Sequence, residues 1–127
     1  MCGFVIEDAA GRMDLVPVRN VVGELPGPPG LPRDARRAFL ADPSAHLALA
    51  RRMRFEGGRI AAFYHSHVDA PAALSDVDLE QALEEGEPMH PCVDQIVIGT
   101  MGCKVLEIQI FRWVGASFHG AVIPLAG

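Results

Sequence analysis

The sequence predicts a mixed α/β (α+β) domain in which helices flank one mixed β-sheet, and three observations support this class. The 127 residues suit one compact domain, so we expect a single domain over residues 1–127. Hydrophobic residues make up 50% of the chain, enough for a sizeable core. Periodic apolar segments follow the order strand, strand, helix, strand, helix and three strands, which is typical of one main sheet with helices packed on it.

Two strands are expected near the N-terminus, over residues 2–6 and 13–22, joined as a hairpin. "CGFVI" is a short apolar run, and the "EDAAGR" that follows is typical of a turn. Pro17 favours an edge position or a bulge, because proline cannot donate a ladder hydrogen bond. The segment 23–32 is rich in proline and glycine and predicts a loop, whereas a short helix and an extended segment both stay open for 33–41.

The clearest helix is expected to begin at Asp42, which can cap it with Pro43 in the first turn. Gly57 and Gly58 can end it. Apolar residues inside it recur at i, i+4 and i+8, at Ala45, Leu49 and Met53. His46 lies in this helix without a partner nearby in sequence, and we expect it at the surface.

The remaining elements are expected to be a strand over 59–67, a helix over 75–86, and strands over 93–101, 104–114 and 117–125. The strand over 59–67 is apolar along most of its length, which predicts burial on both faces. "VLEIQIFRW" alternates as a half-buried strand does. His119 is expected in the last strand as a structural residue.

Charge, hydropathy and cysteine content argue against several classes of function and location for this protein. The net charge is −5 with a single lysine, so phosphate-neutralising contacts to nucleic acid are not expected. Two arginine clusters predict a solvated face, with a docking patch for an acidic partner as the alternative: Arg33, Arg36 and Arg37, and Arg51, Arg52 and Arg54. No apolar run approaches a membrane span of roughly 20 residues, and the N-terminus carries no secretory signal. The odd set of cysteines fits a reducing cytoplasm rather than a disulfide framework: Cys2, Cys92 and Cys103.

The strongest functional pattern lies in "YHSHVDAPAALSDVD". His65 and His67 stand two residues apart at a strand end, so their side chains point to the same side. Two imidazoles suit zinc, and Asp78 supplies a third ligand if the helix that begins near Ser75 packs across the strand end. Ser75 and Asp78 also fit a capping box, which needs no metal. The joint spacing of all four residues favours the metal site.

This stretch resembles the signature of the JAMM (MPN-plus) zinc metalloprotease family, His-Ser/Thr-His, seven residues, Ser-x-x-Asp. The resemblance covers nearly the whole chain. "CGFVI" looks like the Cys-Gly strand that opens the family's domain, and Asn20 falls where many bacterial members have asparagine. Residues 42–67 look like the helix and strand that lead into the motif in short bacterial members. The resemblance implies a single MPN/JAMM domain.

By this resemblance His65, His67 and Asp78 bind zinc with a water in the fourth position, and Ser75 stabilises the oxyanion of the tetrahedral intermediate. Ser66 serves local geometry. The family cleaves peptide or isopeptide bonds at the C-terminal tail of ubiquitin-like proteins. Several small bacterial members release an amino acid or peptide from a ubiquitin-like sulfur-carrier protein. The resemblance therefore implies a cytoplasmic zinc peptidase with such a partner, and it leaves the oligomeric state open.

The family also needs a glutamate as general acid and base, two residues before the Cys of "CG". In this sequence that position falls just before Met1, and the N-terminal helix that usually precedes the glutamate in the family is absent as well. We expect either that the chain is truncated there or that it binds zinc without efficient hydrolysis. Glu7 should lie at the far end of its strand, and Asp69 is the one acid near enough to substitute. Three acids should run down the predicted helix away from the site: Glu80, Glu84 and Glu85.

Smaller departures from the family concern the loop near the motif. Val68 and Leu74 replace prolines that are common there, and residues 85–92 look like a small insertion. The "HPC" in that insertion offers too few ligands for a second metal site. Besides a peptidase, two functions stay open: a catalytically silent zinc-binding MPN domain that binds ubiquitin-like proteins or scaffolds a complex, and a phage tail-assembly peptidase.

Overall fold

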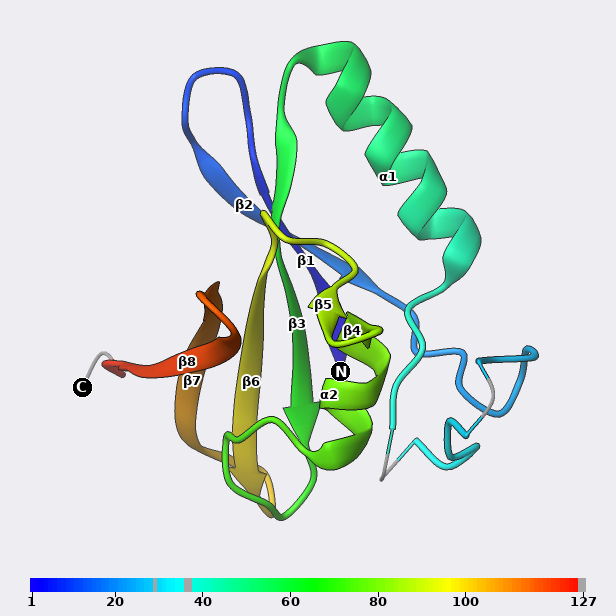
Figure 1. The fold of residues 1–127 in the computed structure, drawn as a ribbon, viewed down its shortest axis with the longest axis vertical. Coiled ribbons are helices and arrows are strands. Elements are labelled where there is room, and N and C mark those ends of the chain that lie inside the picture. The colour runs from blue at the N-terminus through cyan, green and yellow to red at the C-terminus, as the bar shows by residue number, and fades with distance from the viewer. Residues whose placement is uncertain (29, 36–37, 126–127) are drawn as a thin grey trace.

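A mixed β-sheet carries the fold in the computed structural model, which describes residues 1–28, 30–35 and 38–125 (Figure 1). Within that part of the chain, six strands lie in the order β2-β1-β3-β6-β7-β8. Their bounds are Cys2–Glu7 (β1), Met13–Val18 (β2), Arg59–His67 (β3), Asp94–Met101 (β6), Lys104–Val114 (β7) and Ser117–Ile123 (β8). Helices α1 (Pro43–Glu56) and α2 (Asp76–Ala82) and a small hairpin of β4 (Leu83–Glu84) and β5 (Glu87–Pro88) complete the domain. The predicted α+β class is confirmed.

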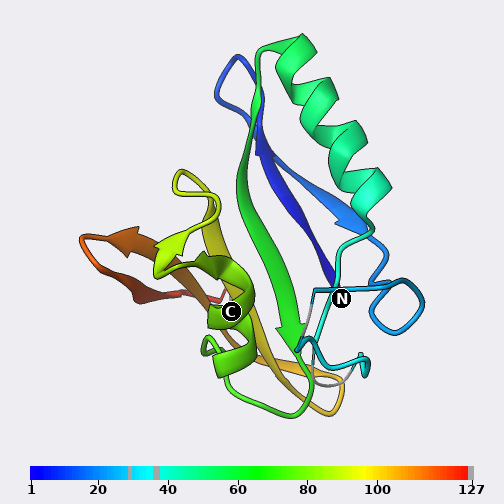
Figure 2. The same cartoon turned by 45° about the vertical axis from the view of Figure 1, so that its right-hand side comes forward.

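The strand register brings the N-terminal end of β1 beside the C-terminal end of β3. The two strands are antiparallel, with Cys2 opposite His65. On its other edge β3 runs parallel to β6, with His65 opposite Val97. A parallel pair needs a crossover connection, and here the crossover carries α2 and the β4–β5 hairpin. As a result α2 lies beside the arrowhead of β3, where the chain's N-terminus also lies (Figures 1 and 2).

The capping residues predicted from the sequence set both ends of helix α1. Asp42 Oδ1 accepts a hydrogen bond from the Ser44 amide at 3.0 Å, and the chain leaves the helix at Gly57 with φ of 79°. The helix buries Leu49 and Met53 against Phe4 and Ile6 of β1 in the main hydrophobic cluster. Burial of each such side chain contributes about 1.5–3 kcal/mol.

The prediction of a helix over 75–86 is wrong beyond Ala82. The chain turns there into the β4–β5 hairpin, and Glu85 and Gly86 adopt positive φ of 53° and 79° at its tip. Two consecutive residues of this conformation suit a tight hairpin turn, which outweighs the helical propensity of the glutamates. Glu84 and Glu85 therefore lie in a hairpin and do not run down a helix.

Other boundaries also shift. The second strand ends at Val18 instead of residue 22, because Asn20 turns the chain into the following loop. The described residues of 33–41 form neither an α-helix nor a strand of the sheet, and Arg36 and Arg37 lie outside the described part. The strands over 59–67 and 104–114 are confirmed to the residue, and β3 is buried on both faces at Ala61, Ala62, Tyr64 and His65.

The prediction of His46 as a surface residue is wrong. Its side chain is half-buried, and its ring lies 4.9 Å from the ring of Phe4 and 5.6 Å from that of Phe63. His119 does lie in the last strand, where it is exposed beside Ser117. Neither described helix is long and apolar enough to cross a membrane. The three cysteines carry free thiols, buried at Cys2 and exposed at Cys92 and Cys103.

Candidate metal centre

Three side chains from two elements converge at the C-terminal end of β3. His65 and His67 come from the strand and Asp78 from the first turn of α2. The two Nε2 atoms lie 3.1 Å apart, and they lie 3.2 Å (His65) and 2.9 Å (His67) from Asp78 Oδ2. Among the described residues this is the one group of three or more potential metal-ligating side chains whose donor atoms lie close together. The structure thus brings together the three predicted ligands.

The triangle of donor atoms has the dimensions of one face of a zinc coordination sphere. Three ligands at about 2.0–2.1 Å from a tetrahedral zinc would lie roughly 3.3 Å from one another. The observed separations of 2.9 to 3.2 Å need to widen by only a few tenths of an ångström. Two imidazoles and one carboxylate also form a donor set that zinc accepts, with a fourth position left open. The residues therefore fit a zinc ion.

The electrostatics of the cluster favour a bound cation. Asp78 is only 8% exposed, and burial alone would raise the pKa of its carboxyl. Hydrogen bonds with His65 and His67 outweigh burial and hold that pKa well below its usual range. The same hydrogen bond to Asp78 raises the pKa of His67, although burial opposes it. A buried carboxylate kept ionised in this way needs positive charge beside it, which protons or a metal can supply.

Each imidazole is oriented by a different contact. His67 Nδ1 lies 3.1 Å from the carbonyl oxygen of Pro71, which directs Nε2 into the cluster. His65 stacks on Phe39, with ring centroids 4.2 Å apart and planes inclined by 20°. Its buried Nδ1 has no hydrogen-bond partner within the described part of the chain. Ring stacking on Phe39 therefore orients His65, whereas the contact with the Pro71 carbonyl orients His67.

The capping box and the metal-ligand cluster coexist in the structure, and the Asp78 carboxylate belongs to both. Ser75 Oγ accepts a hydrogen bond from the Asp78 amide at 3.1 Å, and Asp78 Oδ2 accepts one from the Ser75 amide at 3.0 Å. The helix start thus holds the carboxylate toward the histidines. The bond that Ser75 accepts uses a lone pair of Oγ and leaves the hydroxyl proton for another acceptor.

The loop between β3 and α2 is fastened to the sheet by residues that the sequence did not single out. Thr100 Oγ1 donates to the His67 carbonyl at 2.7 Å, and Glu107 accepts from the Ala72 amide at 3.3 Å. Gly99 allows the loop to pass over β6, because a Cβ there would lie 2.6 Å from the Ala72 nitrogen. A glycine inside a strand was the available signal for such a close approach.

A second group of contacts places Phe39 on His65. Asn20 Oδ1 accepts hydrogen bonds from the amides of Leu40 at 2.9 Å and Val22 at 3.1 Å, and its Nδ2 donates to the Ala38 carbonyl at 3.4 Å. The side chain therefore joins the end of the first hairpin to the segment that carries Phe39. Sequence reasoning assigned Asn20 no role beyond the family resemblance, and it did not identify Phe39 as part of the site.

The other acids considered from the sequence do not join the cluster. Glu7 pairs with Arg59 at 3.1 Å at the far end of β1, as expected. Asp69 is exposed, has φ of 51°, and accepts from the Gly102 amide at 2.8 Å in the β6–β7 turn, so its carboxylate already has a structural role. Ser66 donates its amide and its hydroxyl to the Met1 carbonyl, at 2.9 and 3.4 Å, which fits the expected role in local geometry.

Fold and site together define an α+β domain with a His-x-His and aspartate cluster at the end of its central parallel strand pair. The chain belongs to the family described as prokaryotic homologs of the JAB domain, which it matches over residues 1–114. It is also similar in fold to a solution structure of a protein from Salinibacter ruber, with a TM-score of 0.52 and 19% identity. That match covers 93% of this chain and 72% of the other. Comparison with curated proteins gives no significant match.

Proposed function

We propose that the protein is a zinc-dependent peptidase or isopeptidase that acts on the C-terminal tail of a ubiquitin-like or sulfur-carrier protein in the cytoplasm. The observation that carries this proposal is the triangle of His65, His67 and Asp78 donor atoms with separations of 2.9 to 3.2 Å. Membership in the JAB family, which includes metallopeptidases, supports it. Zinc bound there would polarise the scissile carbonyl and lower the pKa of a water ligand.

The chain's own residues have distinct tasks in this proposal. His65, His67 and Asp78 hold the metal, and Phe39 and the Pro71 carbonyl fix the imidazole orientations. Ser75 lies one turn from Asp78 with its hydroxyl proton uncommitted to the cap, and it donates to the oxyanion that develops on the substrate carbonyl. Replacement of one such donor lowers kcat by about 10²–10³-fold.

Proton transfer in this proposal needs a further carboxylate beside the metal as general acid and base. No second carboxylate belongs to the cluster in residues 1–28, 30–35 and 38–125. Strand register supports a place for one. Cys2 pairs with His65 and the Ser66 amide donates to the Met1 carbonyl, so a residue added before Met1 in the same strand would pair with His67. Its side chain would share the face of Cys2 and the histidines. A glutamate there would stand beside the metal.

A second candidate is a zinc-binding domain that recognises a ubiquitin-like protein without hydrolysis, and the cluster of three ligands alone, among the described residues, is compatible with it. A direct assay separates the two. The zinc-loaded chain, with and without an added N-terminal helix ending in glutamate, is incubated with a sulfur-carrier protein that bears extra C-terminal residues. Intact mass reports cleavage.

If the protein is a peptidase, the added glutamate should raise the rate of carrier cleavage by orders of magnitude. His67→Ala should abolish cleavage. Ser75→Ala should reduce the rate while Ser75→Thr, which keeps cap and hydroxyl, restores much of it. Saturable binding of the carrier without turnover, even in the extended chain, would support the second candidate and contradict the first.

A further inference from the structure

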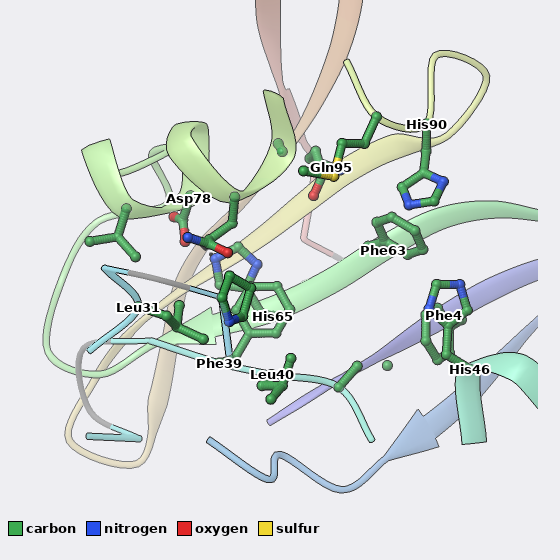
Figure 3. Close-up of a pocket in the computed structure, with 17 residues that line it drawn as sticks. Phe4, Leu31, Phe39, Leu40, His46, Phe63, His65, Asp78, His90 and Gln95 are labelled. Atoms are coloured by element: carbon green, nitrogen blue, oxygen red, sulfur yellow. Dashed lines mark ion pairs between the residues drawn. The ribbon is translucent and has the colours of Figure 1, made fainter. Parts of the chain in front are cut away.

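A cavity of about 240 Å³ opens directly from the metal cluster, and nothing in the proposed chemistry uses it (Figure 3). His65 and Asp78 form one end of its wall, and His46, Phe63 and His90 lie at the other. It is smaller than the roughly 300–1,000 Å³ of pockets that enclose drug-sized ligands. Its size therefore suits one side chain of a longer substrate.

The far wall of the cavity is a cluster of aromatic rings. Phe63 lies edge-to-face with Phe4, at a centroid distance of 5.5 Å and 73°, and with His90, at 5.1 Å and 88°. His46 completes the cluster, 4.9 Å from Phe4 and 6.0 Å from His90. Rings in this arrangement present both edges and faces, and a further ring gains favourable offset or edge contacts with them.

Away from the metal, the described lining residues include no carboxylate, lysine or arginine that could pair with a charged group. Asp78 is the one acidic residue among the described lining residues, which include no lysine or arginine, and its Oδ2 is committed to the histidines. Burial, and then the neighbouring His90, lower the pKa of His46, which favours the neutral form of this imidazole. A charged side chain would lose its hydration here and meet only glutamines and imidazoles away from the metal.

We propose that this cavity is a specificity pocket that receives one uncharged aromatic side chain of the substrate, from a residue next to the bond that is hydrolysed. The inference rests on the proposed zinc peptidase function, because the metal end of the cavity sets the distance between pocket and scissile bond. It adds a sequence preference that the metal ligands alone do not supply.

The test uses hydroxamates, which bind zinc through one end and carry a chosen tail. Binding of acetohydroxamate, 3-phenylpropanohydroxamate and 6-aminohexanohydroxamate to the zinc-loaded protein is measured by calorimetry. The phenyl compound should bind at least about tenfold more tightly than acetohydroxamate, and the charged tail should give no gain. Ala82→Phe, which fills the cavity, should remove the phenyl advantage. Ala48→Phe, on the exposed side of α1, is the matched control and should keep it.

A second readout in the unmodified protein does not depend on how the variants fold. The methyl resonance of Met89, which lines the cavity, should shift with the phenyl compound and not with acetohydroxamate. If acetohydroxamate binds but the phenyl tail brings neither affinity nor a Met89 shift, the pocket inference is overturned and the zinc site stands. If no hydroxamate binds to the zinc-loaded protein, the proposed function fails and the pocket assignment falls with it.

Discussion

Replacement of Asp78 by asparagine separates the metal-binding role of this side chain from its role in the helix cap. Asparagine keeps an oxygen that can accept the hydrogen bond from the Ser75 amide, now 3.0 Å long, so α2 should remain capped within about 1 kcal/mol. The variant loses the charge that faces both imidazoles at 2.9 and 3.2 Å. Structural sites with four ligands bind zinc with a free energy of roughly 10–16 kcal/mol. One ligand therefore corresponds to about 3 kcal/mol, and its loss should raise the Kd for zinc by about 100-fold.

Competition with a chromophoric chelator at pH 7 measures this loss. Asp76→Asn is the matched control, because it removes an equal charge from the same helical turn but lies outside the cluster. We expect Asp76→Asn to bind zinc within about threefold of the unmodified chain. Circular dichroism confirms that both variants fold. Zinc affinity of Asp78→Asn within threefold of the unmodified protein would refute the assignment of Asp78 as a ligand.

Four further predictions concern residues in and around the site. Asn20→Ala should destabilise the fold by about 1–3 kcal/mol and speed hydrogen exchange at the Leu40 amide, whereas Asn20→Asp, which keeps the accepting oxygen, should preserve that protection. Gly3→Ala should destabilise the fold by about 1–3 kcal/mol in urea unfolding, because a Cβ would lie 2.5 Å from Tyr64 Oη. The pKa of His67 is raised in the metal-free protein, so its stabilising contribution should be complete below about pH 6.5 and disappear as pH rises through the raised value. Zinc needs neutral imidazoles, so the increase in Tm on zinc addition should instead grow from pH 6 to 8, and a zinc effect that shrinks over this range would contradict the ligand assignment.

Local signals in the sequence predicted the parts of the fold that local interactions determine. Asp42 with Pro43 and the glycine at Gly57 mark the ends of α1 because caps act within one turn. The start of β3 at Arg59 was predicted to the residue because Gly57 and Gly58 separate this strand from the preceding helix. The error at Ala82 arose because leucines and glutamates continue a helical pattern into Leu83 and Glu84, while the turn at Gly86 competes with it.

The metal ligands were predictable because their spacing along the chain is fixed by one strand and one helix start. The contacts that orient them were not, since they join segments distant in sequence. Phe39 stacks on His65 from a loop whose path depends on Asn20. No hydrophobic periodicity or motif in that loop predicts this contact. His46 did carry a signal: it precedes Leu49 by three residues and Met53 by seven, which places it on the buried face of α1.

X-ray absorption at the zinc edge of the zinc-loaded protein tests the central claim most directly. Two imidazole nitrogens from His65 and His67 and one oxygen from Asp78 predict a first shell of nitrogen and oxygen at about 2.0–2.1 Å with imidazole scattering beyond it. His67→Ala should weaken the imidazole scattering, and Asp76→Asn should leave it unchanged. A sulfur shell at about 2.3 Å would place the metal on the free cysteines instead and contradict the account.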